Sequence, residues 1–225
     1  MASAAGILVE LRTSANPANL TGMARYGISV QNRLGLPVPE MRRIAKAAGK
    51  DHEAALELWQ TGIADARIVA SMIAVPAQLT EEQMEAWVKD FDSWDVCDQV
   101  CMNLFERSPL ARRKIVEWSL RDEEFIRRAA FALLACVAWH DKRATDEELI
   151  AFLPVVERCS TDERNFVKKA VNWALRTIGK RNRALNQAAI EPAWRIQRLD
   201  SKAARWIASD ALRELESAKV RDRLV

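Results

Sequence analysis

The chain has 225 residues, of which 49% are hydrophobic and 29% are charged, and its formal net charge is +3. This balance excludes intrinsic disorder and is typical of an ordinary globular protein. The longest apolar run, Ala129–Trp139, is too short to cross a bilayer. The Ala4–Val9 run lacks the basic start of a signal peptide. We therefore expect a soluble protein with no membrane partner, located in the cytosol or nucleoid of a bacterium.

The order of the predicted elements follows from helix-start and helix-stop signals, because helix-forming residues fill nearly the whole chain and only 27–39 looks extended. Three pairs read as capping boxes: Thr80 with Gln83, Thr145 with Glu148, and Ser160 with Glu163. The predicted helices are 4–13, 17–26, 39–46, 51–60, 64–75, 81–90, 94–107, 110–120, 122–140, 146–158, 161–180, 182–198 and 200–220.

An internal repeat indicates how these helices are arranged. Phe125-Ile-Arg-Arg-Ala and Phe166-Val-Lys-Lys-Ala correspond at an offset of 41 residues, and Ser201–Trp206 is a looser echo. That period suits a two-helix HEAT-like repeat. We expect an all-α fold in which residues 1–225 form a single domain, a right-handed superhelical solenoid of HEAT-like antiparallel helix pairs, with a binding surface on its concave side.

Charge is divided unequally along the chain. Residues 1–100 carry 9 basic and 13 acidic side chains, whereas residues 101–225 carry 25 and 18, so the net charges are −4 and +7. The second half is therefore the more favourable place for an anionic partner, although a mixed charged surface also serves solubility.

The sequence contains no recognisable metal or disulfide pattern. His52 and His140 lie far apart, and Cys136 and His140 share a helix face but lack a third ligand. We expect reduced thiols, no metal and no cofactor. None of the cysteines belongs to a Cys-x-x-Cys pair: Cys97, Cys101, Cys136 and Cys159.

The 94–107 helix begins with a pair that attracts attention. With Ser93 at the N-cap position, Trp94 and Asp98 lie four residues apart and project from one face, on the shoulder of an apolar stripe centred on Val100 and Leu104. An aromatic ring beside a carboxylate suits a cation. Alternatively, Trp94 belongs to the edge of the core and Asp98 serves the helix dipole.

Two later helices carry basic side chains opposite their core stripes. On 161–180, the core stripe contains Val167, Val171, Ala174 and Ile178, and the opposite line contains Lys169, Trp173, Arg176 and Lys180. On 122–140, Arg128 is flanked by Ala132 and Ala135, and we expect it to reach outward. The structural alternative is a tryptophan covered by the next repeat, with lysines extending around it.

Basic faces interleaved with tryptophan predict a nucleic-acid surface, since cations neutralise phosphates and rings lie against sugars or bases. On such a surface Asp98 is repelled by DNA, and a tolerated repulsion indicates chemistry.

At this point the chain resembles the DNA alkylation repair family of HEAT-like-repeat DNA glycosylases, of the AlkD type, from about Met23 to beyond Arg176. It departs from the family pattern at Ser93, where a second tryptophan is usual, and at Cys97, where an aliphatic residue is usual. The motifs that carry the resemblance are Met23-Ala-Arg-Tyr26, Pro39-Glu-Met-Arg-Arg43, Trp94-Asp-x-x-Asp98, Arg127-Arg-Ala-Ala130 and Lys169-Ala-x-x-Trp173-x-Leu-Arg176.

The resemblance implies hydrolytic excision of N3- or N7-alkylated purines from double-stranded DNA by a monomer. It implies that Asp98 is the catalytic carboxylate, that Trp94 and Trp173 contact the damaged nucleotide, and that Arg128 binds phosphate. It also implies a wider DNA-binding set: Tyr26, Arg42, Arg43, Arg127, Lys168, Lys169, Arg176 and Lys180.

Two other readings stay open from the sequence. One is a non-catalytic HEAT-repeat protein that binds damaged or branched DNA with salt-dependent affinity. The other is a protein-binding scaffold, which would need an apolar groove in place of the basic line on 161–180.

Overall fold

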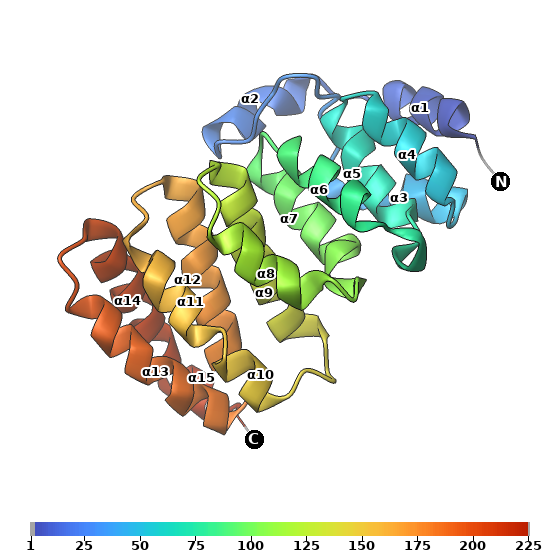
Figure 1. The fold of residues 1–225 in the computed structure, drawn as a ribbon. Coiled ribbons are helices and arrows are strands. Elements are labelled where there is room, and N and C mark those ends of the chain that lie inside the picture. Colours follow the sequence, from blue (N-terminus) through green and yellow to red (C-terminus); the bar gives the residue numbers. More distant parts are fainter. Residues whose placement is uncertain (1–2, 225) are drawn as a thin grey trace. The chain divides into compact units, whose positions relative to one another are not determined.

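The computed structural model describes residues 3–224, and within this range every regular element is a helix (Figure 1). The all-α prediction is confirmed. The chain forms two compact units, residues 1–109 and 110–225, each with its own helix packing. Among residues 3–224, no helix has both the length and the apolar character needed to cross a membrane.

The first unit is built around α5, which packs against α3, α4 and α7. Ile68, Val69 and Ile73 of α5 are completely buried. The helices of this unit are α1 (Ala4–Thr13), α2 (Ala18–Arg25), α3 (Val38–Ala48), α4 (His52–Gln60), α5 (Ala64–Ile73), α6 (Glu81–Lys89) and α7 (Trp94–Asn103), with short 3-10 turns at Pro76–Gln78 and Phe105–Arg107.

The second unit is a row of packed helices in which α9 lies between α8 and α12, and α12 also packs on α13 and α14. Its helices are α8 (Ala111–Ser119), α9 (Glu124–His140), α10 (Asp146–Ile150), α11 (Leu153–Arg158), α12 (Asn165–Gly179), α13 (Arg183–Gln197), α14 (Lys202–Leu215) and α15 (Ala218–Arg221), with a 3-10 turn at Cys159–Thr161.

The repeat found in the sequence corresponds to a structural register. Helix α9 begins at Glu124 and α12 begins at Asn165, so the helix starts differ by the same 41 residues as the sequence motifs. The equivalent rings of Phe125 and Phe166 stack on each other, with centroids 5.5 Å apart. Equivalent positions of α9 and α12 therefore occupy neighbouring places in the second unit.

Several helix boundaries differ from the predictions. The predicted helix 146–158 is two helices, α10 and α11, with Pro154 in the first turn of α11, where its missing N–H costs no hydrogen bond. Likewise 200–220 divides into α14 and α15, and 94–107 ends as a 3-10 turn.

The capping boxes at Thr80 and Thr145 are present, but the one predicted at Ser160 is wrong. The Ser160 hydroxyl is buried and donates to the Glu157 carbonyl. Glu163 instead accepts from the Ser201 hydroxyl and the Ala203 N–H at the start of α14.

Candidate functional site

Trp94 and Asp98 occupy the first turns of α7, one turn apart and both partly exposed. The indole N–H of Trp94 donates to the carbonyl of Tyr26 at 3.1 Å. The Tyr26 side chain is 77% exposed. The structure thus brings together three of the predicted site residues, and the hydrogen bond fixes one edge of the Trp94 ring.

Residues missed in the sequence hold this arrangement in place. Ser93 precedes α7 but does not cap it; its buried hydroxyl accepts from Ser29 N–H at 3.1 Å and donates to Asp95 at 2.6 Å. Arg33 donates to both oxygens of Asp95, at 2.7 and 3.0 Å, and to the Ser29 carbonyl at 2.8 Å. This network ties the segment after Tyr26 to the start of α7.

The same segment is anchored at its other end by Asp65, a fully buried carboxylate on α5. Asp65 accepts from the N–H groups of Leu34 and Leu36 at 2.7 and 2.8 Å. Between them, Gly35 has φ +83°, and a Cβ there would lie 2.3 Å from the Asn16 carbonyl oxygen, so only glycine fits. The position of Tyr26 beside Trp94 therefore depends on long-range contacts that periodicity does not reveal.

The two predicted DNA-binding arginines of α3 have different surroundings. Arg42 is exposed and borders a cavity of about 330 Å³ that Lys46 and Lys50 also line. Arg43 pairs with Glu40 and Glu10, at 2.7 and 2.8 Å, and these hydrogen bonds raise its pKa. Of the two, Arg42 is the better placed for an external anion.

Arg128 does not reach outward as expected. Its residue is only 5% exposed, and its Nη1 donates to the Phe166 carbonyl at 2.6 Å. The sequence argument assumed a single core stripe on this helix, but α9 packs against α8 on one side and α12 on the other, so nearly its whole circumference is buried. Ala132 and Ala135, which flank Arg128 in the pattern, are fully buried.

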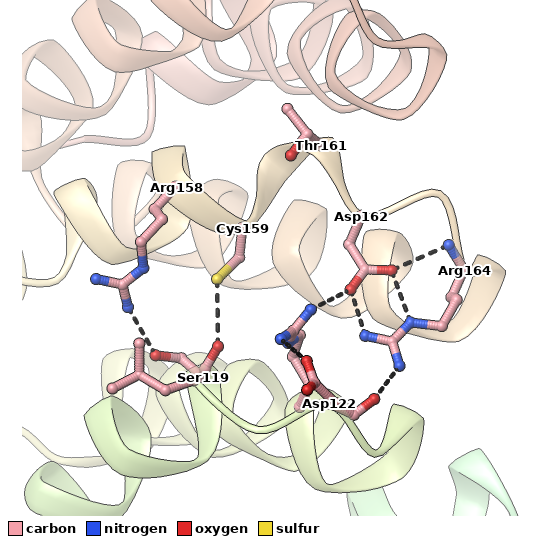
Figure 2. Close-up of a pocket in the computed structure, with 9 residues that line it drawn as sticks. Ser119, Asp122, Arg158, Cys159, Thr161, Asp162 and Arg164 are labelled. Carbon is pink, nitrogen blue, oxygen red and sulfur yellow. Dashed lines mark hydrogen bonds and ion pairs between the residues drawn. The ribbon is translucent and has the colours of Figure 1, made fainter.

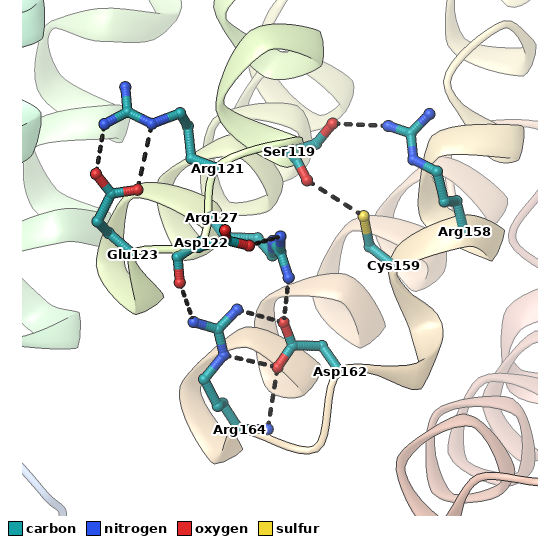
Figure 3. Close-up of polar contacts among 9 residues, drawn as sticks. All are labelled: Ser119, Arg121, Asp122, Glu123, Arg127, Arg158, Cys159, Asp162 and Arg164. Carbon is teal, nitrogen blue, oxygen red and sulfur yellow. Dashed lines mark hydrogen bonds and ion pairs between the residues drawn. The ribbon is translucent and has the colours of Figure 1, made fainter.

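Arg127 lies in a different environment, beside a cavity of about 560 Å³ in the second unit (Figure 2). It donates to Asp162 at 2.9 Å and to Asp122 at 3.2 Å (Figure 3). Arg164 also binds both oxygens of Asp162, at 2.5 and 2.9 Å. Burial disfavours the charge on Asp162, but the hydrogen bonds from Arg164 and Arg127 outweigh it and lower its pKa to about 2.

Across the same cavity, Arg158 donates to the Ser119 hydroxyl at 2.9 Å, and the Cys159 thiol lies 3.5 Å from the Ser119 carbonyl (Figure 2). These contacts join the segment after α8 to the segment before α12. The cluster is therefore a clamp between successive repeats, and Arg127 takes part in it.

The predicted line on α12 is exposed or partly exposed along its length, at Lys169, Trp173, Arg176 and Lys180. Two of its cations are compensated from α14. Arg176 pairs with Asp210 at 2.7 Å and with Glu214 at 2.5 Å, and Lys180 pairs with Glu214 at 2.9 Å.

The start of α12 has no such carboxylates beside it. Lys169 makes no hydrogen bond or ion pair with any residue in 3–224. The ammonium group of Lys168 lies 5.5 Å from the centroid of the exposed Trp206 ring. The line is therefore less basic than its sequence indicates at its end, and most basic at its start.

Trp173 is not covered by the next repeat. It lines a cavity of about 430 Å³ in the second unit, together with Lys180 and residues from the end of α9. Trp94 and Asp98 belong to the first unit, whereas Arg128 and Trp173 belong to the second. Within residues 3–224, no three His, Cys, Asp or Glu side chains are grouped to hold a metal ion.

Comparison with known proteins identifies a family and a fold. Residues 7–215 match the family model described as DNA alkylation repair enzyme. One solved structure, described as a new family related to the HEAT-like repeat DNA glycosylases with affinity for branched DNA structures, is 20% identical, with a TM-score of 0.77 over 94% of this chain and 95% of that chain.

Two engineered proteins are more distant. One has a TM-score of 0.46 at 16% identity, over 80% of this chain and 85% of its own, and the other has 0.45 at 15%, over 97% and 100%. The fold assignment therefore rests on the first structure, and the expected HEAT-like repeat fold is confirmed. No curated protein matches the chain.

Proposed function

The chain belongs to the DNA alkylation repair enzyme family, and from this premise we propose that it is a DNA glycosylase that hydrolyses the N-glycosidic bond of N3- or N7-alkylated purines in duplex DNA. The observation that carries the proposal is the pair on α7, where Asp98 lies one turn from a Trp94 whose indole is fixed by the Tyr26 carbonyl. A carboxylate held beside an oriented aromatic ring suits a reaction that develops positive charge.

The chemistry requires little acid catalysis. An alkylated purine already carries a positive charge, so it departs as a neutral base with the electron pair of the C1′–N bond. Positive charge then develops on the deoxyribose, and the Asp98 carboxylate stabilises it or orients the water that attacks C1′. The water oxygen bonds to C1′, and its proton passes to a base or to solvent. Trp94 and Trp173 contact the sugar, and Arg128 contacts a phosphate.

The decisive experiment measures release of 7-methylguanine and 3-methyladenine from methylated duplex DNA. We expect release by the wild type and a loss of about 100-fold or more in Asp98→Asn, because its carboxylate charge acts on the transition state. The variant should still bind DNA, and more tightly, since a repulsive charge is removed.

Asp92→Asn is the matched control, because Asp92 is an exposed acid two residues before α7. It removes the same charge from the same region and should leave base release unchanged. Absence of release by the wild type would refute the proposed activity.

A second candidate is a non-catalytic protein that binds damaged or branched DNA. The solved structure with the same fold is described as having affinity for branched DNA, and the partial neutralisation of Arg176 and Lys180 fits a surface adapted for a different DNA form. Salt-dependent binding to a four-way junction that exceeds binding to duplex DNA, without base release, would favour this function.

A further inference from the structure

The cavity beside Trp173 contains a second tryptophan that no sequence motif singled out. Trp139, near the end of α9, is 54% exposed and lines this cavity together with Trp173. An indole that large is rarely left half in solvent at the mouth of a cavity unless it meets a partner there.

The repeat explains why Trp139 is on this surface. At the offset of 41 residues, Arg128 corresponds to Lys169 and Trp139 corresponds to Lys180, so Trp139 ends on α9 the same line that Lys180 ends on α12. The intervening positions on α9, Ala132 and Ala135, are small and buried.

The charges that line the cavity are all positive. Lys142 donates to the Trp139 carbonyl at 2.8 Å, and Arg181 donates to the carbonyls of Ala138 and Ala144 at 2.9 and 2.8 Å. These backbone acceptors orient the two cations without neutralising them. Lys180 also lines the cavity and pairs with Glu214, which is not among the lining residues. The cavity therefore presents two indoles and three cations.

Its volume of about 430 Å³ is that of a small-molecule site rather than a protein-binding surface. Cations for phosphate and aromatic rings for a base or sugar are the combination that binds single nucleotides of a nucleic acid. Trp139 is also supported from one side by His140, whose ring stacks on it with centroids 4.9 Å apart.

We propose that the cavity formed by Trp139, Trp173, Lys142 and Arg181 binds one nucleotide unit of the DNA strand, with Trp139 against the base or sugar and Lys142 and Arg181 on the phosphate. This inference rests on the proposed function, because it makes Trp139 a further DNA-contacting residue beside the proposed site residue Trp173. It places no chemistry on Trp139, whose role is binding.

The test measures the affinity of the full-length protein for undamaged duplex DNA by fluorescence anisotropy. We expect Trp139→Ala to weaken binding about tenfold, as for loss of one stacked base, and Trp139→Phe to restore most of it. Lys142→Gln should lower the slope of log K against log salt by about one, whereas Trp139→Ala should leave that slope unchanged.

Trp194→Ala is the matched control, because Trp194 on α13 is 45% exposed but lines none of these positively charged residues. It should change affinity less than twofold. Equal affinities of Trp139→Ala and the wild type would overturn the proposal, as would tight binding of free deoxynucleotide monophosphates that displaces no DNA.

Base release under single-turnover conditions separates this inference from the proposed function. With saturating protein, Trp139→Ala should excise at the wild-type rate, with only the half-saturating concentration raised. If the wild type binds DNA but releases no base, the proposed function fails while the affinity measurements still decide the role of Trp139.

Discussion

Whether a surface cation can serve DNA depends on what already holds it, and α3 contains a natural comparison. Arg42 and Arg43 are adjacent and both exposed, but only Arg43 is paired with glutamates. A paired arginine loses its ion pair when it turns to a phosphate, whereas an unpaired arginine displaces only water and counterions.

We therefore predict that Arg42→Ala lowers the slope of log K against log salt for DNA binding by about one, while Arg43→Ala changes it by much less. Titrations at four or five salt concentrations give both slopes. Each variant removes one unit charge, so a long-range effect of net charge is matched between them. Equal slopes would show that pairing with Glu40 and Glu10 does not decide which arginine contacts DNA.

Asp162 makes the clamp between repeats sensitive to acid. Its pKa of about 2 lies below its ordinary value of 3.8 because Arg164 and Arg127 favour its ionised form. A lowered pKa stabilises the folded state above the unfolded-state value and loses that stabilisation as the pH falls through the folded-state value. The contribution is about 2 kcal/mol at neutral pH.

Asp162→Asn should therefore destabilise the protein by about 2 kcal/mol at pH 7. The difference from the wild type should persist down to about pH 5 and shrink between about pH 4 and pH 2. Urea unfolding of both proteins across this range measures it. A difference that stays constant down to pH 2 would mean that packing, and not ionisation, accounts for the effect.

At the scale of single helices, local signals predicted what local contacts decide. The Asp51 cap of α4 and the capping box at Thr80 were predicted correctly because each uses residues within one turn. The box at Ser160 was wrong because Glu163 bonds to residues 38 and 40 positions away. The burial of Arg128 was missed for the same reason, since a pattern on one helix does not show that α9 is packed on two sides.

The neutralisation of the α12 line depends on the alignment of two helices. Asp210 and Glu214 lie one turn apart on α14 and meet Arg176 and Lys180 of α12. No property of α12 alone indicates it. The α12–α14 pair therefore limits its own attraction for phosphate.

Glu214→Gln should reverse this limit. Removing one carboxylate releases Lys180 and half of the pairing of Arg176, so the affinity for duplex DNA should rise severalfold at low salt and the salt slope should increase by about one. Glu216→Gln is the control, because Glu216 is exposed just beyond α14 and pairs with neither cation. An affinity unchanged by Glu214→Gln would indicate that this end of α12 does not contact DNA.

For the whole molecule, the repeat predicted the fold class, and the motifs predicted which residues to inspect. The offset of 41 residues appears directly in the starts of α9 and α12. The contacts that position Trp94 could not be predicted, because Arg33, Asp65 and Ser93 act across 31 to 64 residues. Whether residues 1–225 behave as a single domain stays a prediction, since the chain contains two compact units.

Charge also differs between those units. Residues 1–109 carry 10 basic and 14 acidic side chains, a net charge of −4, and residues 110–225 carry 24 and 17, a net charge of +7. Long-range attraction therefore draws DNA to the second unit, but it does not select a face. Selection requires the short-range features described above, which are the start of α12 and the cavity at Trp139.

Lysine acylation with and without DNA distinguishes these two contributions. We predict that bound duplex protects Lys142 and Lys169 severalfold, because a lysine that contacts phosphate is shielded and held as an ammonium. Lys89 on α6 and Lys219 on α15 are both exposed. Lys89 lies in the acidic unit, whereas Lys219 shares the positive charge of the second unit but lies outside the α9–α12 surface. Both should react equally with and without DNA, and protection of Lys219 to the same extent as Lys169 would show that net charge alone, without a defined face, governs binding.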